Sequence, residues 1–164
     1  DNLINVCTTL FGGFVVSALV LILGFHCAKG RVKEEYIDEK AYPVQMSDYI
    51  LEYFDENNID IKNVRLYNEY NYGSYLLYRG IPVFIDSRAD LYAPEFNGGR
   101  DIFMDFMQSS NIEVWFEDTF AKYDITHIIL YKDSKMNMII KDAHLKGYNL
   151  LKEDDNFVFY EITK

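Results

Sequence analysis

The stretch RLYNEYNYGSYLLYRGIPVFIDSRADLY, residues 65–92, decides how the rest of the chain is interpreted. Two short runs typical of strands, Val64–Tyr67 and Val83–Asp86, lie in it or at its border, and a polar cluster follows each run. If both strands are parallel members of one sheet, the two clusters meet at the same edge. Open α/β sheets bind ligands at that edge, so we expect the candidate site there.

The candidate residues come from both polar clusters. Asn71 is predicted to cap a short helix, Tyr72–Arg79, whose free N–H groups would face a ligand. Gly73 would let a ligand or a neighbouring backbone come close, and Arg88 can pair with flanking carboxylates through two hydrogen bonds. The alternative is that these residues only cap a helix and brace two loops. The set expected to bind a ligand or organise the loops is Asn68, Tyr70, Asn71, Gly73, Asp86, Arg88, Asp90 and Tyr92.

The flanking segments predict a single α/β domain over residues 42–164. Residues 127–131, HIILY, are nearly continuous apolar, which is typical of a central strand covered on both faces. Apolar residues at helical spacing and turn residues between them define the other elements. They are helices opened by Pro43, at 101–108, after Asn111 to Tyr123 and at 134–146, and a closing hairpin of 148–151 with 157–162. We expect a mostly parallel central sheet with this hairpin as an antiparallel edge.

The beginning of the chain predicts a membrane-spanning helix. No charged side chain occurs between Leu3 and Ala28, and about 20 apolar residues suffice to cross a bilayer. A buried core helix is the alternative. We therefore expect a transmembrane helix in residues 1–28 that contacts the lipid bilayer through residues 3–28, then a polar linker at 29–41. The chain is interpreted as the tail of a longer membrane protein whose upstream helices are missing.

Charge and motif content exclude several function classes. After residue 28 the chain carries 16 basic and 25 acidic side chains, a formal charge of −9, which argues against a nucleic-acid partner. Neither H-x-x-x-H nor C-x-x-C spacing occurs, so no metal site is predicted. The glycine-rich phosphate and dinucleotide motifs and the G-x-S-x-G elbow are absent as well. No cofactor and no catalytic residue are assigned, and a membrane-tethered hydrolase is the least favoured function.

Three motifs carry a resemblance to a known group of proteins. They are Tyr42-Pro43-Val44, N-x-Y-x-x-G-x-Y-L from Asn68 to Leu76, and F-I-D-x-R-A-D-L-Y from Phe84 to Tyr92. Together they resemble the C-terminal soluble domain of bacterial polytopic membrane proteins that are similar to GT-C type glycosyltransferases, which use lipid-phosphate-linked sugars. The resemblance covers residues 42–162. Ser74 and Tyr72 depart from it, because the group often has a second glycine and a tryptophan there.

The resemblance implies a membrane-anchored, extracytoplasmic accessory domain. Catalysis in the group resembles work done by an acidic residue between the first spanning helices, and this sequence has no such loop. The domain is therefore expected to contact a glycan, a lipid-linked sugar or a neighbouring loop without being catalytic. A structural or protein-interaction module without a ligand is the alternative. Lys29, Arg31 and Lys33 would favour a cytoplasmic domain, but the resemblance favours the outer face.

Overall fold

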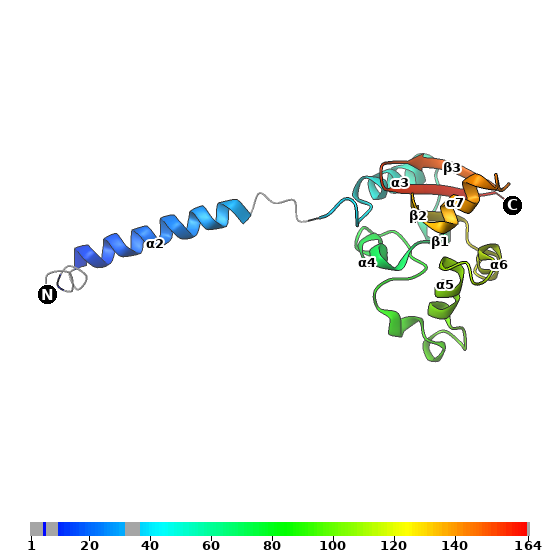
Figure 1. The fold of residues 1–164 in the computed structure, drawn as a ribbon, viewed down its shortest axis with the longest axis horizontal. Coiled ribbons are helices and arrows are strands. Elements are labelled where there is room, and N and C mark those ends of the chain that lie inside the picture. The colour runs from blue at the N-terminus through cyan, green and yellow to red at the C-terminus, as the bar shows by residue number, and fades with distance from the viewer. Residues whose placement is uncertain (1–4, 6–9, 32–36, 164) are drawn as a thin grey trace. The chain divides into compact units, whose positions relative to one another are not determined.

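The computed structural model describes residue 5 and residues 10–31 and 37–163, and the chain forms two compact units, Asp1–Ile37 and Asp38–Lys164. The first contains helix α2, Leu10–Arg31 (Figure 1). Within the described residues, no helix has both the length and the apolar character needed to cross a membrane, so the predicted span in residues 1–28 is not supported. Part of that prediction, residues 1–4 and 6–9, lies outside the described residues, as do residues 32–36 of the predicted linker.

The second unit is built on a four-stranded mixed sheet with the order β1-β2-β4-β3. Only β1 and β2 are parallel, whereas β2 with β4 and β3 with β4 are antiparallel. An α/β fold is therefore confirmed, but the prediction of a mostly parallel sheet is wrong. The closing hairpin is present, and its strand β4 lies inside the sheet beside β2. The strands are β1 Leu66–Tyr67, β2 His127–Tyr131, β3 Tyr148–Glu153 and β4 Phe157–Ile162.

Helices cover both faces of this sheet, because the buried strands carry apolar side chains on both sides. Ile129 and Phe159 pack with residues of α3 and α4, while Ile128 and Val158 pack with residues of α5, α6 and α7. Figure 1 shows the two groups of helices on either side of the strands. The helices are α3 Val44–Glu56, α4 Tyr70–Tyr78, α5 Ile102–Ser110, α6 Phe116–Lys122 and α7 Lys135–Asp142, with short 3-10 turns at Ile61–Asn63, Ala89–Tyr92 and Pro94–Phe96.

The predicted second strand, Val83–Asp86, does not form. Instead of pairing with a strand, the backbone there pairs with one side chain: Asn68 Oδ1 accepts hydrogen bonds from Phe84 N at 2.8 Å and Ile85 N at 3.4 Å, and its Nδ2 donates to Ile85 O at 2.8 Å. A buried backbone must find hydrogen-bond partners, but these need not be a strand. The segment is apolar from Val83 to Ile85, but it contains a bend at Phe84 and belongs to no sheet.

The helix predicted after Asn111 starts late. Asn111 instead ends α5 as its C-cap residue, and Ile112 has a φ of 61°, a left-handed conformation that interrupts a right-handed helix. Trp115 then serves as the N-cap residue of α6. The apolar spacing over 112–123 therefore spans a turn and a shorter helix.

Candidate functional site

Asn68 connects the end of β1 to the segment around residue 85. Its side chain is fully buried, and besides the three hydrogen bonds described above its Nδ2 donates to Glu69 O at 2.9 Å. Both ends of the amide are thus used inside the protein. Asn68, predicted as a ligand or loop residue, organises the loop and has no polar atom left for a ligand.

Gly73 brings α4 against the same segment. A Cβ atom at this position would collide with Ile85 O and would lie 2.9 Å from both Asn68 Nδ2 and Asp86 Cα. The close approach that we predicted for Gly73 therefore exists, and the partner is neighbouring backbone. The space beside it is filled by the chain itself.

Asp86 and Arg88 form an ion pair that closes their own loop. Arg88 Nε donates to Asp86 Oδ1 at 3.0 Å and to Oδ2 at 3.1 Å, Arg88 Nη2 pairs with Oδ2, and Arg88 N donates to Oδ1 at 2.8 Å. These hydrogen bonds, helped by one from Tyr92, lower the pKa of Asp86 although burial opposes them. Asp90 is exposed, and no hydrogen bond or ion pair of its side chain occurs among the described residues. The predicted Asp–Arg–Asp cluster is therefore an Asp86–Arg88 pair with Tyr92.

Helix α4 begins two residues earlier than predicted, and its N-cap residue is Glu69. The Glu69 N–H donates to Tyr72 Oη at 3.3 Å, and Tyr72 Oη donates to Ile129 O of β2 at 2.8 Å. Asn71 is thus not the cap. It lies exposed in the first turn of α4. The buried Tyr72 fixes this helix start to the sheet and so fixes the position of Glu69.

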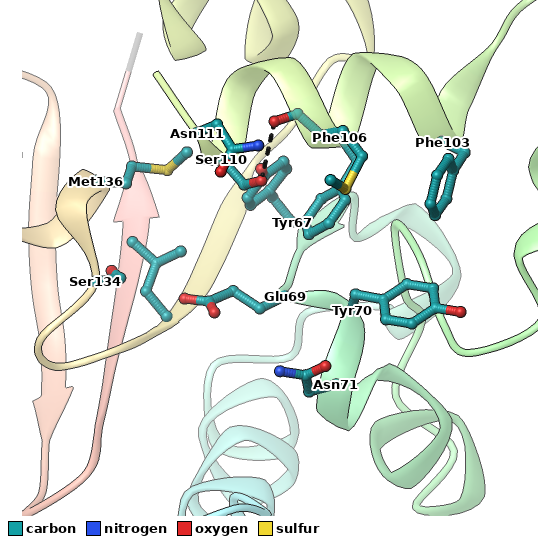
Figure 2. Close-up of a pocket in the computed structure, with 12 residues that line it drawn as sticks. Tyr67, Glu69, Tyr70, Asn71, Phe103, Phe106, Ser110, Asn111, Ser134 and Met136 are labelled. Carbon is teal, nitrogen blue, oxygen red and sulfur yellow. Dashed lines mark hydrogen bonds between the residues drawn. The ribbon is translucent and has the colours of Figure 1, made fainter. Parts of the chain in front are cut away.

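A cavity of about 440 Å³ opens at the carboxyl ends of β1 and β2, the edge where the site was expected. Two predicted residues, Tyr70 and Asn71, line it, whereas Asp86, Arg88, Asp90 and Tyr92 do not. Figure 2 shows Glu69 between Tyr70 and Ser134, and the rings of Phe103 and Phe106 that α5 contributes to the same cavity. The other lining residues are Tyr67, Met107, Ser110, Asn111, Leu130 and Met136. Aromatic walls with a few polar groups are typical of small-molecule sites.

Tyr70 and Phe103 form one wall of this cavity. Their ring centroids lie 5.9 Å apart at an interplanar angle of 78°, an edge-to-face contact that stabilises both rings. Tyr70 Oη also donates to Ser87 O at 3.0 Å. The wall is therefore held in place from both sides, by α5 and by the segment that follows residue 85.

Glu69 is the only acidic residue in the cavity wall. The pKa of its carboxyl group is raised to about 7: burial raises it, a hydrogen bond from Tyr131 N to Glu69 Oε1 at 3.1 Å partly offsets this, and the neighbouring Asp133 adds a smaller increase. A carboxyl group with a pKa near neutrality can exchange a proton under physiological conditions, and such groups cluster at functional sites.

We expect the free energy of unfolding to depend on pH through Glu69. The folded state holds this proton more tightly than the unfolded state, so the contribution is fully present below pH 4.5 and is lost as the pH rises through about 7. The loss amounts to about 2–3 kcal/mol. Urea denaturation from pH 5 to 8 measures it. Glu69→Gln keeps an acceptor for Tyr131 N and serves as the reference.

The difference in free energy of unfolding between the wild type and Glu69→Gln separates the contribution of Glu69 from that of other groups that titrate in the same pH range. Burial lowers the pKa of His127. His127 therefore lowers the free energy of unfolding when the pH falls below the ordinary pKa of histidine, which is the opposite pH dependence to that of Glu69. This contribution is the same in both proteins. If the two proteins showed parallel pH profiles, the Glu69 carboxyl group would not be desolvated as the structure indicates.

Comparisons with known proteins add no relative to this picture. No family model matches the chain, and neither a curated protein nor a solved structure matches it. The site therefore rests on geometry. Among the described residues no group of three or more His, Cys, Asp or Glu side chains is placed to hold a metal ion.

Proposed function

We propose that residues 38–163 form a non-catalytic binding domain that holds a sugar residue, from a glycan or a lipid-linked sugar, in the cavity beside Glu69. The observation that carries this proposal is the combination of an aromatic wall with hydrogen-bonding groups in one concave site. Sugars present apolar C–H faces and polar hydroxyl edges, and aromatic rings with amide and hydroxyl groups satisfy both. Tyr70 and Phe103 would contact a sugar face, and Asn71, Ser110 and Asn111 would reach its hydroxyl groups.

The proposed setting is the outer surface of a bacterial membrane, as part of a glycosyltransferase-like membrane protein. The resemblance of the motifs between Tyr42 and Tyr92 supports this setting. The apolar surface of α2 supports contact with a lipid bilayer: Phe14, Leu21 and Phe25 are 73%, 73% and 68% exposed. A contiguous exposed apolar surface is typical of a site that contacts a membrane or another protein. We propose lipid as the environment of α2.

A structural module without a ligand is the second candidate, and a specific observation favours it. Six of the eight predicted site residues make contacts inside the domain: Asn68, Tyr70, Gly73, Asp86, Arg88 and Tyr92. They need no ligand to explain their presence. The two candidate functions differ in what they predict for the cavity, because a purely structural module has no reason to keep an aromatic pocket open.

Phe103→Ala tests the proposed function. We expect the variant to bind monosaccharides at least about tenfold more weakly, because loss of an aromatic wall removes about 1–2 kcal/mol of contact. Calorimetric titration of the full chain in detergent micelles with glucose, N-acetylglucosamine and glucosamine measures this. Met104→Ala is the matched control, since Met104 follows on the same helix, is 48% exposed and does not line the cavity. Equal affinities of the wild type and Phe103→Ala would place the sugar outside this cavity, and no binding by the folded wild type would favour the structural module.

A further inference from the structure

The charge of the cavity wall is unbalanced. Among its twelve residues Glu69 is acidic and none is Lys, Arg or His. The titratable groups that interact most strongly with Glu69 are Asp133, at the β2–α7 connection, and the tyrosines Tyr67, Tyr72 and Tyr131. None of them can supply a positive charge. No ion pair of Glu69 with a Lys, Arg or His side chain therefore occurs in the part of the chain that the structure describes.

A carboxylate without a cation beside it is unfavourable in a partly desolvated site, although Glu69 accepts a hydrogen bond from Tyr131 N and caps the N-terminus of α4. Glutamine would provide the same acceptor for Tyr131 N. The remaining surroundings suit a cation, because the rings of Tyr70, Phe103 and Phe106 present negative faces and the thioethers of Met107 and Met136 are polarisable. The chain after residue 28 also carries an excess of acidic residues, which attracts cations and repels anions over distances of about 10 Å.

We propose that the ligand of this cavity carries a primary ammonium group that pairs with the Glu69 carboxylate, so that the bound sugar is an amino sugar with a free amine. This inference rests on the proposed function and specifies its ligand. The ammonium group would donate to Glu69, while the sugar ring contacts the wall formed by Tyr70 and Phe103. Hydrogen bonds between charged groups are stronger than those between neutral groups, and the cavity excludes part of the solvent that would weaken this pair.

Binding is linked to the release of a proton. In the free protein near pH 6 the Glu69 carboxyl group holds a proton, because burial raises its pKa to about 7. An ammonium ligand binds the carboxylate, so this proton leaves for the solvent as the complex forms, and no covalent bond changes on the ligand. The apparent affinity therefore scales with the ionised fraction of Glu69, which falls roughly tenfold or more between pH 7.0 and 5.5.

Three sugars that differ at one carbon test the proposal. Glucosamine has a free amine, N-acetylglucosamine has a neutral amide and glucose has a hydroxyl group at that position. We expect the full chain in detergent micelles to bind glucosamine at least about tenfold more tightly than the other two at pH 7.0. We expect this preference to decrease about tenfold at pH 5.5 and to disappear in Glu69→Gln, which should still bind all three sugars.

The outcomes separate this inference from the proposed function. Equal binding of the three sugars by the wild type would overturn the amino-sugar inference and leave the proposed function intact. A preference for glucosamine that persists in Glu69→Gln would overturn the assignment of Glu69 as its partner. Absence of binding by any of the three sugars, with thermal melting showing a folded protein, would contradict both.

Discussion

Replacing Gly73 by Ala is expected to lower the free energy of unfolding by about 3 kcal/mol, the upper end for overpacking of a well-packed site. In an exposed helix the same substitution would stabilise by up to about 1 kcal/mol. Here the added methyl group collides with Ile85 O, a backbone atom that Asn68 holds in place. Because the obstacle is fixed backbone, α4 must move away from the segment around residue 85.

Asn71→Ala is the control for this measurement, because Asn71 lies exposed two residues earlier in the same helix. It should leave the urea midpoint nearly unchanged. If Gly73→Ala unfolded at the same urea concentration as Asn71→Ala, the close packing of α4 against residues 85 and 86 would be contradicted.

Asn68→Ala is expected to destabilise the domain by about 3 kcal/mol. The substitution leaves Phe84 N and Ile85 O without the partners they have in the folded protein, at 2.8 Å each, and each orphaned buried group costs about 1–3 kcal/mol. Because the segment has no strand neighbour to take over these bonds, hydrogen exchange of the amides around residue 84 should accelerate as well. Chemical denaturation and exchange measured by mass spectrometry record the two effects.

Asn57→Ala provides the matched comparison. Asn57 is an exposed residue that donates one hydrogen bond, to Tyr53 O at 2.8 Å, so its removal should cost at most about 1 kcal/mol. Unchanged exchange around residue 84 in Asn68→Ala would show that backbone contacts, and not this side chain, hold the segment.

Local patterns in the sequence were sufficient for several elements. Helix α3 follows Pro43 as predicted, and its buried Met46, Ile50 and Phe54 recur at helical spacing. Strand β2 coincides with the apolar run at 127–131. In each case the deciding signal is contained within one turn or one strand, so no distant contact can override it.

The prediction failed where a distant or unusual partner decides the backbone. Val83–Asp86 has the composition of a strand, but its hydrogen bonds go to Asn68, and no periodicity shows that a side chain will replace a neighbouring strand. Similarly, Glu69 replaced Asn71 as the cap of α4. Glutamate is not among the preferred N-cap residues, and its position depends on Tyr72 and Tyr131, which lie in the folded core.

A cavity lies at the edge of the sheet where the sequence predicted a site, but only two of the eight predicted residues line it. Tyr70 and Asn71 line the cavity, but Glu69, which also lines it, was not among the predicted site residues. Phe103 and Phe106 come from α5, whose apolar face indicated a core helix and gave no sign that two rings would face a cavity. Only the packing of α5 against the end of β1 brings them there, and a single sequence does not reveal that contact.

The five methionines offer the most direct test of binding in the cavity. Met107 and Met136 line it, Met46 lies in the core on the other face of the sheet, and Met104 and Met138 are 48% exposed. NMR spectra of protein labelled with ¹³C in its methionine methyl groups report on all five sites. Addition of glucosamine should shift the signals of Met107 and Met136 and leave those of Met46, Met104 and Met138 in place. Shifts confined to the exposed methionines, or no shift at saturating sugar, would contradict a binding site in this cavity.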